Sequence, residues 1–415
     1  MAAIADTLLR AAWVCPVAAP PLREGWVAVH EGRISAVGTG HDAPRAMRVE
    51  DLGDVVLLPG LVNAHTHLEL SWLKGRVPPG PDFLTWVGGL MRSRTAPEQP
   101  GDPATDGPCR AAIAEMQATG TVAVGDIANA LISPALLAEA GMPGVVFHEL
   151  IGFRVTDGAR HVEEARARHA GLASRDVRIA VAPHAPFSVS RELFTAIRDA
   201  AAKSVPPVTS VHVGESPEEV TLLTTGDGPW RDRLVALNAW RDDWTAPGRG
   251  AGDYLCDLGV ITAGTLVVHG VQLTDAELAR IAATGATLVT CPRSNTWVGV
   301  GAPPIARFLA SGVRLAVGTD SLASAPDLNL FAELAEMRRL APEAPARALL
   351  AAATEGGANA LALGDAFGAI APGRHADLVA VSVPAGLADP EEALVQGVDA
   401  SRIRPWRARD VEGVH

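Results

Sequence analysis

The chain has 415 residues, 48% of them hydrophobic, so it can bury a large core as one large domain or as two to three ordinary ones. Its formal net charge of −12, with basic residues scattered among the acids, argues against nucleic acid or an anionic membrane as the main partner. The four cysteines form no CxxC pair, and neither a signal peptide nor an apolar stretch near the roughly 20 residues that span a bilayer is evident. We therefore expect a soluble, cytoplasmic protein that acts on a small molecule.

From residue 55 onward, short apolar runs alternate with segments of helical periodicity, which predicts repeated βα units on a parallel sheet. The eight runs cover residues 55–65, 121–127, 144–152, 177–185, 207–215, 265–273, 287–295 and 313–321. Helical patterns between them begin with Ser, as in SRELFTAIRDAAAK, or end with Gly, as in TDAELARIAATG, as helix caps prefer. Eight strands and eight helices over about 300 residues predict an α/β fold of the (β/α)8 TIM-barrel type.

The two ends of the chain lie outside these units. Residues 1–54 contain WVAVHEGRISAVG, with an EG turn between two alternating runs, and residues 367–415 contain the strand-like FGAIAPGRHADLVAVSV. We therefore expect a small composite β-sandwich domain built from residues 1–54 plus 367–415, beside a barrel at residues 55–366. The Pro- and Gly-bearing stretch at residues 96–108 is predicted to be a long loop of the barrel.

Ionisable residues close several of the apolar runs, at the end of each strand where the chemistry of such barrels lies. These residues are His65 and His67 in the first run, His184 in the fourth, His212 in the fifth, His269 in the sixth and Asp320 in the eighth. Residues i and i+2 of a strand point to the same side, so His65 and His67 present two imidazoles toward one point. That spacing alone is more often structural than metal-binding. His212 and Asp320 complete a set of three neutral nitrogens and one carboxylate, which suits zinc or ferrous iron with a position left for water.

Glu215 follows His212 by three residues, just past the end of the fifth run. A carboxylate beside metal-bound water can accept the proton of the water and pass it to the substrate, which predicts a proton shuttle. The alternative is an acid at a helix N-terminus, because ESPEEV is typical of a helix start, and both roles are compatible. His269 is placed to hold the water or to polarise the atom under attack.

Taken together, the ordered segments PGLVNAHTHLE, APHAPFSVS, HVGES, VVHG, TCPRSN, GTDSLAS and PGRHADLV resemble the amidohydrolase superfamily, in its deaminase and chlorohydrolase branch. The resemblance implies His65, His67, His212 and Asp320 as ligands of a single divalent metal, zinc first and iron second. It also implies Glu215 as the proton shuttle, with His269 beside the hydrolytic water, and His184 as a substrate contact. Binuclear members carry a carboxylated lysine on the fourth strand, and VRIAVAPHA has no lysine, so one metal ion per chain is expected.

Within this branch, HVGESPEEVTLLTTGDGPWRDRL, DYLCDLGV and VTCPRSN look most like 6-aminodeoxyfutalosine deaminases of the alternative menaquinone route. The resemblance implies a hydrolase that acts on C–N bonds other than peptide bonds, with an adenine-type nucleoside as its small-molecule substrate. The alternatives are deamination of S-adenosylhomocysteine, methylthioadenosine or another nucleobase, chlorohydrolase-like hydrolysis on the same site, and a scaffold without activity. Relatives often dimerise, so a homodimer is one option for the oligomeric state.

Three charged residues and one tryptophan-bearing segment are further candidates for substrate contacts or for ordinary structural roles. Glu69, two residues past His67, either points into the cavity or caps the following turn. Arg154 in HELIGFR is either a residue that binds a substrate carboxylate or ribose or an ordinary surface arginine, and the same alternatives apply to Arg293 in CPRSN. The tryptophans of residues 228–244 either form a wall over a bulky nucleoside or pack an insertion.

Overall fold

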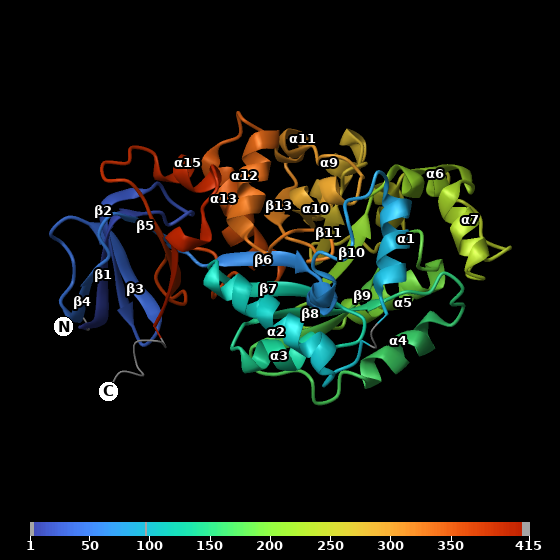
Figure 1. Cartoon of the computed structure of the whole chain (residues 1–415), viewed down its shortest axis with the longest axis horizontal. Coiled ribbons are helices and arrows are strands. Elements are labelled where there is room, and N and C mark those ends of the chain that lie inside the picture. Colours follow the sequence, from blue (N-terminus) through green and yellow to red (C-terminus); the bar gives the residue numbers. More distant parts are fainter. Residues whose placement is uncertain (1–3, 96–97, 409–415) are drawn as a thin grey trace. The chain divides into compact units, whose positions relative to one another are not determined.

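Two four-stranded sheets of the α/β type carry the eight predicted runs, except for the first half of the first run. The computed structural model describes residues 4–95 and 98–408 (Figure 1). The first sheet has the order β6-β7-β8-β9 and contains β6 (Leu61–Thr66), β7 (Thr121–Ala128), β8 (Gly144–Leu150) and β9 (Val177–Pro183). The second has the order β10-β11-β12-β13 and contains β10 (Thr209–Val213), β11 (Thr265–His269), β12 (Thr287–Thr290) and β13 (Arg314–Val317). The paired strands whose registers are resolved run parallel, which confirms the predicted class of fold.

Backbone hydrogen bonds also join the ends of the two sheets. His212 N donates to His184 O at 2.9 Å, just past the end of β9, and Thr319 N and Asp320 N both donate to His65 O at 3.1 Å, near the end of β6. A continuous strand ladder between the two sheets is not assigned in the part of the chain that the structure describes, so closure of the barrel stays a prediction. These bonds nevertheless bring the carboxyl ends of β6, β9, β10 and β13 together.

Helices alternate with these strands, as the periodicity predicted. They are α1 (Phe83–Ser93), α2 (Pro103–Ala118), α3 (Ser133–Glu139), α4 (Gly158–Ala167), α5 (Arg191–Ala201), α6 (Pro217–Thr225), α7 (Pro229–Ala236), α8 (Ala251–Asp257), α9 (Asp275–Thr284), α10 (Pro292–Trp297), α11 (Ile305–Ala310), α12 (Leu330–Leu340), α13 (Ala346–Ala351), α14 (Gly357–Ala360) and α15 (Pro390–Val395). Short 3-10 turns occur at Leu68–Leu73 and Ala400–Arg402, and a π-turn at Ala352–Gly356. None of the helices in the described residues is long and apolar enough to cross a membrane.

The predicted caps are confirmed at the start of α5, which Ser190 caps, and at the end of α9, where Gly285 adopts a left-handed conformation with φ of +76°. Ser190 accepts a hydrogen bond from Leu193 N at the start of α5, and Thr274 forms a capping box with Glu277 at the start of α9. The predicted loop at 96–108 is wrong in its second half, because α2 begins at Pro103, a residue favoured in the first helical turn. Residues 96–97 of that loop lie outside the described residues.

A separate mixed sheet is built from both ends of the chain, with the order β15-β14-β5-β1-β2-β3 and β4 paired with β1. Its strands are β1 (Ala5–Val14), β2 (Leu22–His30), β3 (Arg33–Thr39), β4 (Ala46–Asp51), β5 (Val55–Pro59), β14 (Asp377–Ser382) and β15 (Ile403–Arg407). The β2–β3 hairpin turns at Glu31 and Gly32, where the EG turn was predicted. All seven strands belong to one sheet, so a sandwich and the domain boundaries proposed for it stay predictions; residues 1–3 and 409–415 lie outside the described part.

The first predicted strand is divided at Gly60, which the sequence interpretation did not anticipate. β5 pairs with β1 and β14 in the terminal sheet, whereas β6 lies in the sheet with β7. A side chain at residue 60 has no room, because a Cβ there would lie 2.3 Å from Val122 Cγ1. The apolar run at 55–65 is therefore two strands, and the second one carries the paired histidines.

Candidate active site

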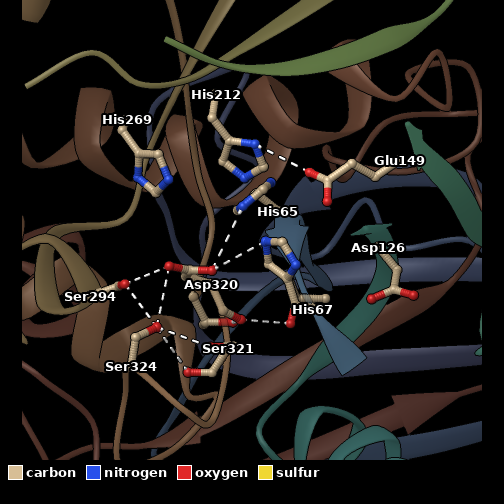
Figure 2. Close-up of polar contacts among 12 residues, drawn as sticks. His65, His67, Asp126, Glu149, His212, His269, Ser294, Asp320, Ser321 and Ser324 are labelled. Carbon is tan, nitrogen blue, oxygen red and sulfur yellow. Dashed lines mark hydrogen bonds and ion pairs between the residues drawn. The ribbon is translucent and has the colours of Figure 1, made fainter. Parts of the chain in front are cut away.

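His65 and His67 lie at the end of β6, where strand alternation turns both side chains to the same side. Their ring centroids are 5.0 Å apart, and those of His65 and His212 are also 5.0 Å apart. One ring nitrogen of each of His65, His67 and His212 lies within 4.8 Å of the others, as a common metal ion requires (Figure 2). The structure therefore brings together three of the four predicted ligands from two different sheets.

Asp320 is the fourth predicted ligand, and it faces the same point from beyond the end of β13. Its Oδ1 lies 3.8 Å from His65 Nε2 and 3.5 Å from His67 Nε2. Its Oδ2 accepts hydrogen bonds from Ser294 Oγ at 2.5 Å and Ser324 Oγ at 3.2 Å (Figure 2). Because the two serines hold Oδ2, Oδ1 is the oxygen presented to the histidines.

The protonation states of these groups suit a divalent cation. Burial lowers the pKa of His212 to about 3 and holds the pKa of His65 well below its usual range, so both rings are neutral at pH 7. Burial acts against the charge of Asp320, but His67 and the other histidines lower the pKa of its carboxyl overall. Three neutral imidazoles and one carboxylate are a donor set that fits zinc or iron.

His212 shows an orientation typical of metal-ligating histidines. Its Nδ1 donates to His184 O at 3.0 Å and lies 3.4 Å from Glu149 Oε1. A proton on Nδ1 leaves the lone pair of Nε2 available, and such a partner fixes the tautomer and the ring of a ligand. The residues present therefore fit the predicted metal site.

Glu215 is buried, and its Oε1 lies 3.5 Å from His269 Nε2. Burial, followed by the nearby Asp320 carboxylate, raises its pKa well above the usual range of glutamate. Glu219 fixes the backbone beneath it by accepting from Gly214 N at 3.1 Å and Glu215 N at 3.0 Å. The structure thus places Glu215 beside the histidine cluster, and Ser216 rather than Glu215 caps helix α6.

His269 is oriented by a side-chain amide. Asn295 Nδ2 donates to His269 Nδ1 at 3.0 Å, so the ring proton lies on Nε2, the nitrogen that faces Glu215. Burial lowers the pKa of His269 to about 4, and the ring is therefore a neutral hydrogen-bond donor near pH 7. This arrangement suits a ring that holds a small polar molecule next to Glu215.

His184 lines the same cavity, on the side of His212. Its Nδ1 lies 2.5 Å from Ser188 Oγ, and burial lowers its pKa to about 3. Glu149, His184 and His212 also have side-chain atoms within 4.8 Å of one another. Since His184 is neutral and reaches the cavity, it can exchange a hydrogen bond with a ligand there.

The cavity above the histidines has a volume of about 180 Å³ and a largely aromatic wall. Trp230 stacks on Phe187 with a centroid separation of 4.0 Å, and Phe83 meets Trp230 edge-on at 6.1 Å. Trp230 is therefore the tryptophan of residues 228–244 that forms a wall, whereas Trp240 and Trp244 pack on Phe153. A flat, largely apolar ligand fits such a wall.

Two predicted substrate contacts have other partners in the structure. Glu69 Oε2 accepts from Asn129 N and Ala130 N, both at 2.9 Å, and its Oε1 accepts from Ile132 N at 2.8 Å. Because three backbone donors occupy this carboxylate and it does not line the cavity, the geometry favours the structural alternative for Glu69. Arg154 is directed to Asn238 O at 2.9 Å and likewise does not line the cavity.

Arg293 of CPRSN donates to both the carbonyl and the carboxylate of Asp327, at 2.8 and 2.9 Å, and does not line the cavity either. The neighbouring residues Ser294 and Asn295 of the same segment contact Asp320 and His269, and the sequence interpretation did not assign them. Glu149 was also missed. It closes the third apolar run, so the rule that identified the other strand-end residues points to it as well.

Comparison with known proteins agrees with this geometry. The sequence profile of the amidohydrolase family matches residues 56–403. An aminodeoxyfutalosine deaminase of Deinococcus radiodurans is 33% identical over 326 residues, covering 74% of this chain and 74% of that protein. A 5-methylthioadenosine/S-adenosylhomocysteine deaminase of Nitratidesulfovibrio vulgaris is 31% identical over 403 residues, covering 92% of this chain and 84% of that protein.

Two solved structures are similar over nearly the whole chain. An adenosine deaminase from Xanthomonas campestris with bound zinc has a TM-score of 0.82 at 29% identity, covering 97% of this chain and 92% of the other. The aminofutalosine deaminase of Helicobacter pylori in complex with methylthio-coformycin has a TM-score of 0.82 at 27% identity, covering 96% of this chain and 97% of the other.

Proposed function

The chain belongs to the amidohydrolase family and is a hydrolase that acts on C–N bonds, and from this premise we propose that it deaminates a purine nucleoside. The observation that carries the proposal is the cluster of His65, His67, His212 and Asp320 with Glu215 beside it, at the base of an aromatic cavity. Relatives whose names describe nucleoside deamination support the substrate class.

The family is metal-dependent, and we propose one zinc ion per chain held by the same four residues. A divalent metal ion bound there lowers the pKa of a coordinated water toward 7 and so supplies a nucleophile at neutral pH. The zinc in the similar adenosine deaminase supports this choice of metal. A closed (β/α)8 barrel is part of the same proposal, supported by the hydrogen bonds from Asp320 and His212 that link the two sheets.

The side chains of the site then have distinct tasks. Glu215 takes a proton from water and delivers it to the ring nitrogen next to the attacked carbon, because its carboxyl faces the same space as the histidines. His269 uses its Nε2 proton to orient the water, and the fixed Asp320 accepts a hydrogen bond from it. His184 donates to or accepts from the purine ring, and the aromatic wall excludes bulk water before ammonia leaves.

We propose 6-aminodeoxyfutalosine as the substrate, with methylthioadenosine and S-adenosylhomocysteine as the alternatives that the second relative supports. The menaquinone pathway that such a substrate implies stays a prediction. A different bond, such as C–Cl, is also compatible with the site, since a chlorohydrolase shares the fold at 22% identity and a TM-score of 0.78.

A coupled ammonia assay separates these proposals. The panel contains 6-aminodeoxyfutalosine, methylthioadenosine, S-adenosylhomocysteine, adenosine, guanine and cytosine, and a chlorotriazine is followed in parallel by chloride release. We expect ammonia from one or more adenine nucleosides and about one metal ion per chain by elemental analysis. Chloride release without ammonia release would contradict deamination, and a reproducible two ions per chain would contradict the mononuclear site.

A further inference from the structure

Helix α1 turns one complete face toward the cavity. The cavity-lining residues of this segment are Phe83, Trp86, Val87, Leu90, Met91 and Arg94. Their spacing of three, four and seven residues is that of one stripe along an α-helix. Five members of the stripe are apolar, and the last, Arg94 at the C-terminal end of α1, is basic. Arg94 is the one lysine or arginine among the described residues that line this cavity.

The two ends of the stripe face different parts of the cavity wall. Phe83 contacts Phe187 at a centroid distance of 6.5 Å, and Phe187 meets His184 edge-on at 5.4 Å, so the first turn of α1 lies on the histidine side. At about 1.5 Å per residue, Arg94 lies roughly 16 Å from Phe83 along the helix axis. A ligand that extends along α1 from the histidines thus meets apolar side chains first and a cation last.

Arg94 is held by a single acid among the described residues. Its Nε donates to Glu98 Oε1 at 2.9 Å and its Nη2 to Glu98 Oε2, and the Arg94 and Glu98 side chains are 28% and 10% exposed. A guanidinium has five N–H donors, and Glu98 uses one on each of two nitrogens. The edge formed by Nη1 and Nη2 therefore remains for a second carboxylate, in the bidentate geometry that arginine favours.

The remaining ionisable side chains of the cavity are not suited to an anion. Glu149, Glu215 and Asp320 are acidic, and the described residues that line the cavity include no lysine or arginine besides Arg94. The proposed metal ion is already taken up by its four ligands and the attacking water, so an anionic tail near the histidine cluster would lie beside these carboxylates. The favourable place for an anion is accordingly at Arg94, at the other end of the stripe.

We propose that Arg94 is a specificity-determining residue that binds a carboxylate at the far end of an apolar or aromatic 5′ substituent of the substrate. This inference rests on the proposed nucleoside deamination and deepens it, because it names the chemical class of the tail. The purine lies at the histidines, the tail follows the apolar side chains of α1, and its carboxylate pairs with the Nη1–Nη2 edge of Arg94. Glu98 orients the guanidinium from the opposite edge.

The test uses two synthetic substrates that differ in one carboxylate, 5′-deoxy-5′-(3-carboxyphenylthio)adenosine and 5′-deoxy-5′-(phenylthio)adenosine. Arg94→Met keeps the length of the stem and removes the charge. Arg92→Met is the matched control, because Arg92 lies on the same helix, is exposed and does not line the cavity. Ammonia release is measured for each pair, with kcat and KM determined separately.

We expect Arg94→Met to lower kcat/KM for the carboxylated compound by about 10- to 100-fold, mainly through a higher KM. For the phenyl compound, kcat/KM should change by less than about twofold. Arg92→Met should leave kcat/KM unchanged for both compounds. An equal fall for both compounds would indicate a structural role and overturn the inference, as would unchanged kinetics. If the wild-type enzyme releases ammonia from neither compound and not from methylthioadenosine, the result contradicts the proposed deamination itself. The role of Arg94, which depends on that function, is then contradicted as well.

Discussion

Replacing Gly318 with alanine tests how closely β13 must approach β6 to bring Asp320 to the histidines. Gly318 follows β13 directly, and its N–H donates to Thr290 O at 3.0 Å. A Cβ at this position would lie 2.5 Å from His65 O, 2.7 Å from His65 Cβ and 2.8 Å from His65 N. Two of these three neighbours are backbone atoms of a strand, so no rotamer change relieves the contact.

The loss of stability follows from the separation of β6 from the segment after β13. These segments are joined by hydrogen bonds from Thr319 N and Asp320 N to His65 O, both at 3.1 Å, and the separation weakens both bonds. Overpacking of this kind costs about 1–3 kcal/mol, and each weakened backbone hydrogen bond costs about 1 kcal/mol more. We therefore expect Gly318→Ala to lower the free energy of unfolding by about 3–5 kcal/mol and to weaken metal binding at least tenfold, because Asp320 moves away from His65.

Urea denaturation measures the free energy of unfolding, and competition with a chelator measures metal affinity independently of activity. Gly89→Ala is the matched control, because a Cβ there meets Val77 Cγ1 at an ordinary 3.6 Å inside helix α1. Alanine in a helix interior is favoured over glycine, so this control should be as stable as wild type or more stable by up to about 1 kcal/mol. Wild-type stability and metal affinity in Gly318→Ala would refute the reasoning.

Three further outcomes follow from the site and its surroundings. Glu215→Gln should keep its metal, as elemental analysis will show, and lose about 10²- to 10⁴-fold in kcat, whereas a near-wild-type rate would contradict its role as proton shuttle. Ser294→Ala removes a donor to Asp320 Oδ2 and should weaken metal affinity by about 10- to 100-fold, as measured by competition with a chelator. An unchanged affinity would contradict a role of Ser294 in orienting Asp320 for the metal. Burial, and next the adjacent Arg168, lowers the pKa of His148 to about 4. As the pH falls, His148 is therefore protonated in the unfolded chain before it is protonated in the folded protein. The free energy of unfolding should accordingly decrease as the pH drops from about 6.5 to about 4. Urea denaturation at several pH values in that range should show that the free energy of unfolding decreases less in His148→Gln than in the wild type. The same decrease in both proteins would exclude His148 as a cause.

The fold was predictable to the extent that apolar runs mark buried strands. Each of the eight runs contains at least one strand, because a strand buried on both faces needs Val, Ile and Leu without interruption. The division of residues 55–65 was not predictable by the same rule, since both halves are buried throughout and read as one strand. Which sheet each half joins depends on pairing partners from distant parts of the chain, such as β14 for β5.

The residues of the proposed metal site could be identified from the sequence because the ends of parallel strands converge, and that rule needs only the strand positions. Glu69 and Glu149 show its limit. Both are buried acids near strand ends, yet backbone N–H groups of residues 129–132 occupy Glu69, whereas Glu149 reaches His212. The sequence contains no local signal for this difference, because a loop contributed by the next strand decides where the free donors lie. Likewise, Trp230 on helix α7 lies in the cavity wall, whereas Trp240, in the segment after that helix, packs on Phe153 instead.

His269 and Asp320 are held in backbone conformations that side chains rarely adopt, with φ of +73° and +57°. Such conformations cost about 1–3 kcal/mol each and persist where the surroundings determine them from several directions. Here the Asn295 amide fixes the ring of His269, while Ser294 and the bond to His65 O fix Asp320. Since these contacts are made by the protein alone, the side chains need not reorganise when a metal ion or a substrate arrives. In the proposed function, the strain at the two strand ends is a cost of folding that lowers the cost of metal binding and of proton transfer.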